Sequence, residues 1–216
     1  MRYGYEYADL YLIATFPSLK IDIEQYPAVK QHLLSFGYDR LKQTGEPGAR
    51  KKTGNKWFET QDSISYWDDF NRQKIIYPGI MRIAKSNQSN FPRFALDNDQ
   101  NFHFGNDCYF IVGENLDYLY LLLNSTLLGY LFRYYIYSFD ETGFKIFTEF
   151  FQNIPLPLPN KEVLKTAQKF HSKKIDIQSV NNWVYEMINF TKEEIKEIEN
   201  SVSAILNNVN EFQQTQ

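Results

Sequence analysis

A short β-branched run that ends in Pro-Gly constrains the fold of this sequence more than any other feature. Residues 74–77 read Lys-Ile-Ile-Tyr, and Pro78 and Gly79 follow directly. Isoleucine and tyrosine favour a pleated, half-buried backbone, whereas proline fixes φ and glycine tolerates a reversal of the chain. The run therefore predicts a β-strand that stops at a turn, and with it a sheet on which the other elements pack.

Further strands and helices are predicted on both sides of this run. Short strands are expected at residues 10–14, 94–96, 102–104, 108–112 and 144–148, with a tight turn at 105–107 and a loop at 138–143. Helical spacing of apolar residues is found at residues 23–36, 116–135, 161–174, 180–188 and 191–206. The mixture indicates an α/β (mixed α+β) fold, in which residues 1–159 form a small β-sheet body with packed helices. Residues 160–216 are expected to be a helical C-terminal segment that packs on this body.

Several helix ends have local chemical signals. Pro27 suits a first helical turn, where its missing N–H has no partner to lose. Asn115 is a candidate N-cap, because its side-chain oxygen can accept a free backbone N–H. Thr191 and Glu194 have the spacing of a capping box. Residues 207–216 are predicted to fray.

Charge is distributed unevenly along a chain whose net charge is −3. Between residues 39 and 93, eleven Lys and Arg stand against six Asp and Glu, so this stretch carries +5 and the remainder −8. A net negative charge argues against a simple basic nucleic-acid binder. A basic middle is nevertheless typical of a DNA-facing surface as well as of a solvated face, and charge alone leaves both interpretations open.

Composition excludes several classes of protein. The single cysteine, Cys108, excludes an internal disulfide, and with no signal peptide a cytoplasmic location is expected. No stretch approaches the roughly 20 apolar residues of a membrane helix, so no membrane partner is expected. Sixteen tyrosines and eighteen phenylalanines are ample for an aromatic core or for a binding surface.

Catalytic motifs are missing from the sequence. It contains no Pro-Pro of an adenine methyltransferase motif, no G-x-G-x-x-G cofactor loop and no P-loop. The three histidines and the cysteine lack ligand spacing and are expected to be structural or exposed: His32, His103, His171 and Cys108. No catalytic residue, no metal site and no cofactor are therefore predicted in this chain, which is not expected to be an enzyme by itself.

Six segments in a fixed order resemble a known family. They are W-F-E at 57–59 with Y-W-D-D-F at 66–70, K-I-I-Y-P-G-I at 74–80, F-A-L-D at 94–97, N-D-C-Y-F-I-V-G at 106–113, L-L-L-N-S-T-L-L-G-Y at 121–130 and F-Q-N-I-P-L-P-L-P at 151–159. Together they resemble the TaqI-like C-terminal specificity domain over roughly positions 1–200. The flanks at 2–13 and 183–199 resemble the opening segment and the closing helices of that family.

The resemblance implies a function in DNA recognition. The family is the target-recognition domain of bacterial adenine-specific DNA methyltransferases and of type II restriction enzymes fused to them. Its implied partners are double-stranded DNA and an N-terminal methyltransferase domain outside this chain, which would bind S-adenosylmethionine and methylate a flipped adenine at N6. The alternative is a protein–protein interaction module of a larger assembly, which a large exposed apolar patch would favour.

Two polar segments supply the candidate DNA contacts. Arginine, lysine, asparagine and glutamine side chains read base edges. The predicted base readers lie between two strands of the region that resembles the family: Arg82, Lys85, Asn87, Gln88, Asn90 and Arg93. The predicted phosphate-binding residues lie in or next to a Gly-rich loop at 43–55: Arg50, Lys51, Lys52 and Lys56. Ordinary polar turns have the same composition, and Trp57 beside them is expected to pack against protein rather than to stack on a base.

Overall fold

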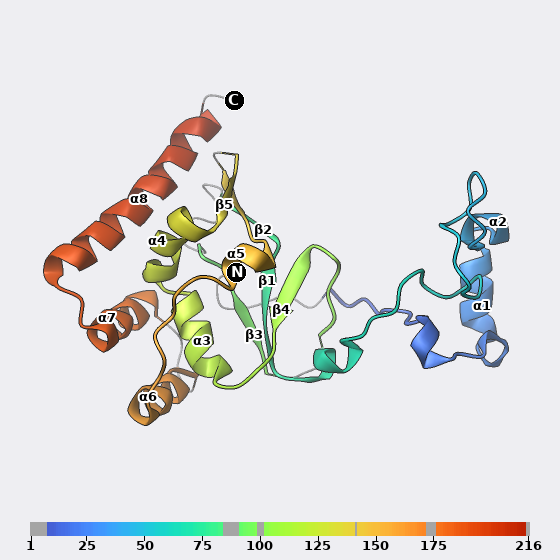
Figure 1. Ribbon diagram of the computed structural model, residues 1–216, viewed down its shortest axis with the longest axis horizontal. Coiled ribbons are helices and arrows are strands. Elements are labelled where there is room, and N and C mark those ends of the chain that lie inside the picture. The colour runs from blue at the N-terminus through green and yellow to red at the C-terminus, as the bar shows by residue number, and fades with distance from the viewer. Residues whose placement is uncertain (1–7, 84–90, 99–101, 141, 172–175, 215–216) are drawn as a thin grey trace. The chain divides into compact units, whose positions relative to one another are not determined.

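The computed structural model describes residues 8–83, 91–98, 102–140, 142–171 and 176–214, with the backbone alone at 171 and 208–214 (Figure 1). The chain forms two compact units, an N-terminal unit Tyr7–Asp68 and a main unit that contains Asp69–Gln216. Helices and small antiparallel sheets occur together, so the predicted mixed α/β fold is confirmed. The predicted division into 1–159 and 160–216 differs from these units and stays a prediction.

Two three-stranded antiparallel sheets form the centre of the main unit. The first has the order β3-β1-β4, with bounds β1 Lys74–Pro78, β3 Ala95–Asp97 and β4 Cys108–Ile111. The second has the order β2-β6-β5, with bounds β2 Ile80–Arg82, β5 Tyr137–Phe139 and β6 Gly143–Lys145. The predicted loop at 138–143 is therefore wrong, since its two ends pair as a hairpin.

Gly79 connects the two sheets. Its N–H donates to the Asp107 carbonyl at 2.8 Å, and its own carbonyl accepts from the Ile146 N–H at 2.8 Å. The predicted strand at 74–77 is confirmed, but the predicted reversal at Pro78-Gly79 is wrong. Pro78 still pairs with Cys108, and the chain continues into β2 with a new partner strand.

The long helix predicted at 116–135 is two helices, α3 Leu116–Leu123 and α4 Thr126–Tyr135. The buried Asn124 amide interrupts it, because its Oδ1 accepts from the Phe94 N–H at 3.1 Å and its Nδ2 donates to the Phe94 carbonyl at 3.0 Å. Ser125 then caps α4 by accepting from the Leu128 N–H. Asn115 is not the predicted side-chain cap, since it has a left-handed φ of 56° and makes no capping bond.

The core lies between these two helices and the sheets. Fully buried side chains from both kinds of element meet there: Ile75, Met81, Leu121, Leu122, Leu123, Leu128, Phe132 and Ile146. Leu127 of α4 is also buried. Leu119 and Leu131 are half-buried against the same cluster.

Four more helices follow: α5 Thr148–Phe151, α6 Lys161–His171, α7 Ile177–Ile188 and α8 Lys192–Gln214. Helix α6 packs on α3 and helix α8 on α4. The capping box is confirmed, because the Thr191 N–H donates to Glu194 Oε2 at 2.7 Å and the Glu194 N–H to Thr191 Oγ1 at 3.2 Å. Helical backbone continues to Gln214, where fraying was predicted from residue 207 onward, and residues 215–216 lie outside the described residues.

The strand predicted at 102–104 is wrong, since these residues have no regular structure, and two of their side chains pack on one buried ring. His103 stacks on Phe70 with centroids 4.8 Å apart, and Phe104 packs on the same ring at 5.2 Å. Phe70 belongs to the 3₁₀ helix η3 Trp67–Asn71. The strand predicted at 144–148 is also shorter than expected, because helix α5 begins at Thr148.

The N-terminal unit consists of short elements: η1 Pro17–Leu19, η2 Ile23–Gln25, α1 Pro27–Leu34 and α2 Tyr38–Leu41. The helix predicted at 23–36 is thus a 3₁₀ turn followed by α1, which begins at Pro27 as expected. The strand predicted at 10–14 is wrong, since residues 8–16 have no regular structure and Leu10–Leu12 find no apolar cover. Among the helices of the described residues, none is both long and apolar enough to cross a lipid bilayer.

Candidate nucleic-acid interface

One side of the second sheet faces away from the core. The pairing places Ile80, Lys145 and Tyr137 in one cross-strand row, and Arg82, Gly143 and Phe139 in another. Because side chains alternate along a strand, these rows point to the face opposite the buried Met81 and Phe144. We call this surface the outer face and define it by five side chains: Ile80, Arg82, Tyr137, Phe139 and Lys145.

Arg82 is held in a fixed position on the outer face. Its guanidinium carbon lies 4.8 Å from the centroid of the Phe139 ring, on the far side of Gly143. A Cβ at Gly143 would approach the Met81 carbonyl oxygen to 2.5 Å, so only glycine lets β6 lie this close to β2. Because Gly143 has no side chain, the guanidinium of Arg82 can reach across it to the ring of Phe139.

The hairpin turn holds the other end of the Arg82 side chain. Its Nη1 donates to Thr142 Oγ1 at 2.8 Å and to Asp140 Oδ2 at 3.2 Å. Hydrogen bonds from the Thr142 hydroxyl and N–H, and then from Arg82, keep the pKa of Asp140 below its ordinary value. The Nε and Nη2 groups of Arg82 make no hydrogen bond within the described part of the chain. These donors have the fork geometry that recognises guanine O6 and N7 or a phosphate.

Arg93 lies next to Arg82. Its Nη1 donates to the Arg82 carbonyl at 2.7 Å, and its backbone N–H contacts the Met81 sulfur at 3.2 Å. Burial lowers the pKa of Arg93 below its ordinary value. The structure thus brings together the two predicted base readers that flank residues 84–90. The other four lie outside the described residues: Lys85, Asn87, Gln88 and Asn90.

The predicted phosphate-binding residues fall into two kinds, and all four lie in the N-terminal unit. Arg50 faces the inside of its loop, where Nε donates to the Leu41 carbonyl at 2.7 Å and Nη2 to the Trp57 carbonyl at 2.5 Å. Lys56 donates to the Ile21 carbonyl at 3.1 Å. Lys51 and Lys52 are exposed.

Hydrogen bonds to main-chain carbonyls shape this loop. The buried Gln43 amide donates to the Lys56 and Glu59 carbonyls at 3.0 and 2.8 Å, and the Asn55 amide donates to the Thr60 carbonyl at 2.9 Å. Trp57 is half-buried and packs against Tyr38, with ring centroids 5.8 Å apart. The loop is therefore a defined platform that presents Lys51 and Lys52 to solvent.

One lysine of the basic stretch is not on the surface. Lys74 and Asp97 form a fully buried ion pair, with Nζ and Oδ2 2.5 Å apart. The same ammonium donates to the Phe70 carbonyl at 2.6 Å. The +5 count of residues 39–93 therefore overstates the surface charge of this region.

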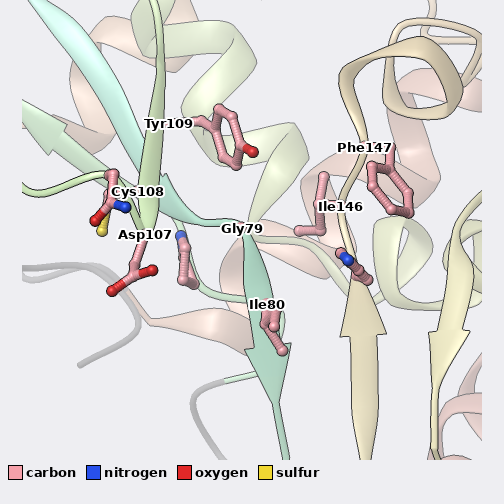
Figure 2. Close-up of a pocket in the computed structure, with 10 residues that line it drawn as sticks. Gly79, Ile80, Asp107, Cys108, Tyr109, Ile146 and Phe147 are labelled. Carbon is pink, nitrogen blue, oxygen red and sulfur yellow. The ribbon is translucent and has the colours of Figure 1, made fainter. Parts of the chain in front are cut away.

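A pocket of about 350 Å³ opens at the junction of the two sheets (Figure 2). It shares Ile80 and Lys145 with the outer face, and Tyr109 and Phe147 lie on either side of it. The sequence analysis did not single out these residues. The strands that carry Ile80 and Lys145, 80–82 and 143–145, are too short to show an alternating pattern.

The two histidines whose side chains are described pack against aromatic rings. His32 packs against Phe36 and His103 stacks on Phe70, while the side chain of His171 lies outside the described residues. Cys108 is half-buried, and burial, with the nearby Asp107, raises the pKa of its thiol. Over the residues that the structure covers, no group of three or more His, Cys, Asp or Glu could hold a metal ion.

A scan against known protein families gives no match to this sequence, and a search of curated proteins gives none either. The resemblance to the TaqI-like specificity domain therefore rests on the six sequence segments alone and stays a prediction.

Proposed function

We propose that this chain is the DNA target-recognition part of a site-specific adenine-N6 methyltransferase, or of a type II restriction–modification enzyme that contains one. In this proposal the chain is cytoplasmic and has no activity by itself. The catalytic residues and S-adenosylmethionine belong to an N-terminal methyltransferase domain outside the chain. The order of the six sequence segments supports the proposal, and the outer face of the second sheet supplies the observation that carries it.

The outer face has the chemistry of a duplex reader. It presents a guanidinium and an ammonium between aromatic rings, and Arg82 is fixed by Phe139 and the hairpin turn before any ligand arrives. A side chain that is already ordered loses less conformational entropy on binding. Arginine to guanine is the commonest specific base contact, and lysine adds sequence-independent attraction to phosphates.

Residues 84–90 complete the proposed reading surface. Arg82 and Arg93 stand at its two ends and contact one another through the Arg82 carbonyl. In this proposal Lys85, Asn87, Gln88 and Asn90 read base edges beside Arg82. Arg93 serves mainly to hold the end of the segment, because burial and the carbonyl contact already occupy its guanidinium. Lys51 and Lys52 supply phosphate contacts from the N-terminal unit.

The test is selection of the whole chain against a pool of random duplexes at two salt concentrations. Enrichment of one short motif is expected, with affinity that falls as salt rises. Arg82→Ala should relax one position of that motif and cost about 1–3 kcal/mol of discrimination there. Arg72→Ala is the matched control. Arg72 is 56% exposed and paired with Asp69, whereas Arg82 is 55% exposed and paired with Asp140.

Equal weakening of cognate and random duplexes by Arg82→Ala would show that Arg82 contacts phosphate and reads no base. No binding of any duplex at low salt would overturn the proposal.

A second function is favoured by the apolar surface of the N-terminal unit. Helix α1 buries none of its residues, and several large apolar side chains of the same unit are exposed: Leu10, Tyr11, Leu12, Tyr26, Phe36 and Tyr38. Exposed apolar side chains, where they gather, are typical of a protein-interaction surface. In this alternative the chain is a protein–protein interaction module of a larger assembly. The supporting result would be no duplex binding at low salt together with binding of a separately purified methyltransferase domain that Phe36→Asp abolishes.

A further inference from the structure

The pocket at the sheet junction has an ordered aromatic wall. Tyr109, on β4, stacks on Tyr77 with centroids 5.8 Å apart and an interplanar angle of 26°. Tyr77 packs in turn on Phe94 at 5.4 Å and on Phe151 at 5.2 Å. The row thus begins in the buried core and ends at Tyr109, which is 43% exposed. A planar ring that enters the pocket would be the next member of this row.

Gly79 fixes the position of that last ring. A Cβ at Gly79 would come within 2.5 Å of Tyr109 Cε2, so the ring lies directly against the glycine backbone. Gly79 is itself held on both sides by the Asp107 and Ile146 main chains. Tyr109 is therefore a platform set by the junction of the two sheets, and any side chain at position 79 would push it out of place.

Polar groups stand at the rim of the same pocket. The Asp107 carboxylate lies on the Tyr109 side (Figure 2). On the other side Lys145 also lines the pocket, with its ammonium 4.7 Å from the Phe147 ring centroid. A carboxylate accepts hydrogen bonds from exocyclic amino groups such as cytosine N4, and an ammonium binds phosphate. The volume of about 350 Å³ lies at the small end of the range for ligand pockets, which suits a single nucleotide.

We infer that this pocket binds one unpaired nucleobase that carries an amino group, together with its phosphate. The base stacks on Tyr109, its amino group donates to Asp107, and Lys145 contacts the phosphate. Adenine, cytosine and guanine meet this requirement, whereas thymine has no amino group. The ligand can be a free nucleotide or a base displaced from a duplex, and the chemistry of recognition is the same for both.

The inference is independent of the proposed reading of paired DNA. The outer face would contact the edges of stacked base pairs, while the pocket needs a base with a free ring face. The pocket and the outer face meet at Ile80 and Lys145, so a displaced base could occupy the pocket while the neighbouring duplex contacts the face.

The test uses 2-aminopurine, a fluorescent amino-bearing base that is quenched when it stacks. Three probes are titrated with the whole chain: 2-aminopurine deoxyriboside monophosphate, a duplex with one bulged 2-aminopurine, and the same duplex with that base paired. Quenching by the free nucleotide or tighter binding of the bulged duplex is expected. Quenching of the free nucleotide alone identifies a free nucleotide as the ligand. Tighter binding of the bulged duplex than of the paired duplex identifies a displaced base.

Variants separate this site from a general affinity for nucleic acid. Tyr109→Ala should weaken binding of the responding probe about 5- to 100-fold, the range for loss of one base stack, while Tyr109→Phe should retain it. Gly79→Ala should act like Tyr109→Ala, because it displaces the ring without removing it. Tyr134→Ala is the control, since Tyr134 is an exposed tyrosine on α4 outside the pocket.

Competition gives the specificity of the site. Unlabelled dAMP and dCMP should displace the probe at lower concentration than dTMP, and Asp107→Ala should abolish that difference. Cys108 lines the pocket and is the sole cysteine of the chain, so bound dAMP should also slow its alkylation.

Two outcomes overturn the inference: no quenching with either unpaired probe, or quenching that Tyr109→Ala leaves unchanged. Selection of a paired motif in the duplex pool would in that case still support the proposed function. Conversely, nucleotide binding without any duplex selection would leave the pocket in place and remove that function.

Discussion

The N-terminal unit and the main unit bury different kinds of side chain. The main unit encloses a continuous aliphatic and aromatic core, in which Ile75, Leu128 and Phe132 are almost completely buried. In the N-terminal unit the described buried residues include only a few apolar ones, such as Phe58, and among them stand the polar Gln43 and Glu59. Side-chain hydrogen bonds to main-chain carbonyls therefore stabilise the N-terminal unit, whereas apolar packing stabilises the main unit.

This difference shows that a basic residue can serve three separate purposes in one chain. Arg50 holds a loop by donating to carbonyls, Lys74 forms a buried ion pair, and Arg82 is half exposed on a sheet surface, paired with Asp140. A count of charged residues in the sequence treats all three residues alike. Substitution of each should give a different signature in stability and in binding.

The largest effect is expected in the main unit, at the buried pair of Lys74 and Asp97. Lys74→Met leaves the Asp97 carboxylate buried without its cation, which should cost about 3–5 kcal/mol of unfolding free energy. The double variant Lys74→Met/Asp97→Leu removes both charges and should recover most of the loss. Urea denaturation of the three proteins measures both effects. A single variant within about 0.5 kcal/mol of the parent, the range of ordinary surface changes, would show that the pair does not hold the sheet.

In the N-terminal unit a smaller and more local effect is expected at Arg50. Burial lowers the pKa of Arg50, and two main-chain carbonyls depend on its guanidinium. Arg50→Ala should cost about 1–3 kcal/mol of local stability, because those carbonyls lose their donors. Limited proteolysis should then cut within residues 42–57 sooner, while the denaturation midpoint of the main unit stays unchanged.

Lys51→Ala is the matched control for Arg50→Ala, since Lys51 is the next residue and is exposed. If it accelerated cleavage equally, the carbonyl contacts of Arg50 would not be what holds the loop.

Sequence reasoning predicted the parts of the fold that local chemistry determines. The strand at 74–77, the helix start at Pro27 and the capping box at Thr191 each depend on residues within a few positions. The mixed α/β class followed from the same short-range patterns. These features need no knowledge of the distant chain, which is why they could be predicted.

The features that sequence reasoning missed depend on distant contacts. Asn124 ends a helix because Phe94, 30 positions away, offers both a donor and an acceptor to its amide. Gly79 continues a strand where Pro-Gly predicts a reversal, because Asp107 and Ile146 bond to it from two sides. The candidate site was only partly predicted, because some of its residues are brought together by distant contacts. Arg82 and Arg93 were singled out as polar residues, but Tyr109 and Lys145 become neighbours only when the two sheets join.

Helix α8 should lose part of its stability at low pH. Hydrogen bonds from the Thr191 N–H and then from its hydroxyl lower the pKa of Glu194 below its unfolded value. A lowered folded pKa stabilises the helix above the unfolded pKa, and this contribution is lost as pH falls below the unfolded pKa and through the lower folded pKa. Glu194→Gln should therefore flatten the loss of helicity over that window, as followed by circular dichroism. Glu193→Gln removes the same charge outside the capping box and should leave the acid transition in place.

The smallest effect on stability is expected at Lys51, where the effect on DNA binding should be the most general. Lys51→Ala changes an exposed side chain and should alter unfolding by no more than about 0.5 kcal/mol. If Lys51 contacts a phosphate, the slope of log affinity against log salt should fall in magnitude by about one, equally for cognate and random duplexes. Lys30→Ala is the control, because Lys30 in the same unit pairs with Glu24 at 2.6 Å. An unchanged slope would show that Lys51 contacts no phosphate and would leave Lys52 as the proposed phosphate contact of the N-terminal unit.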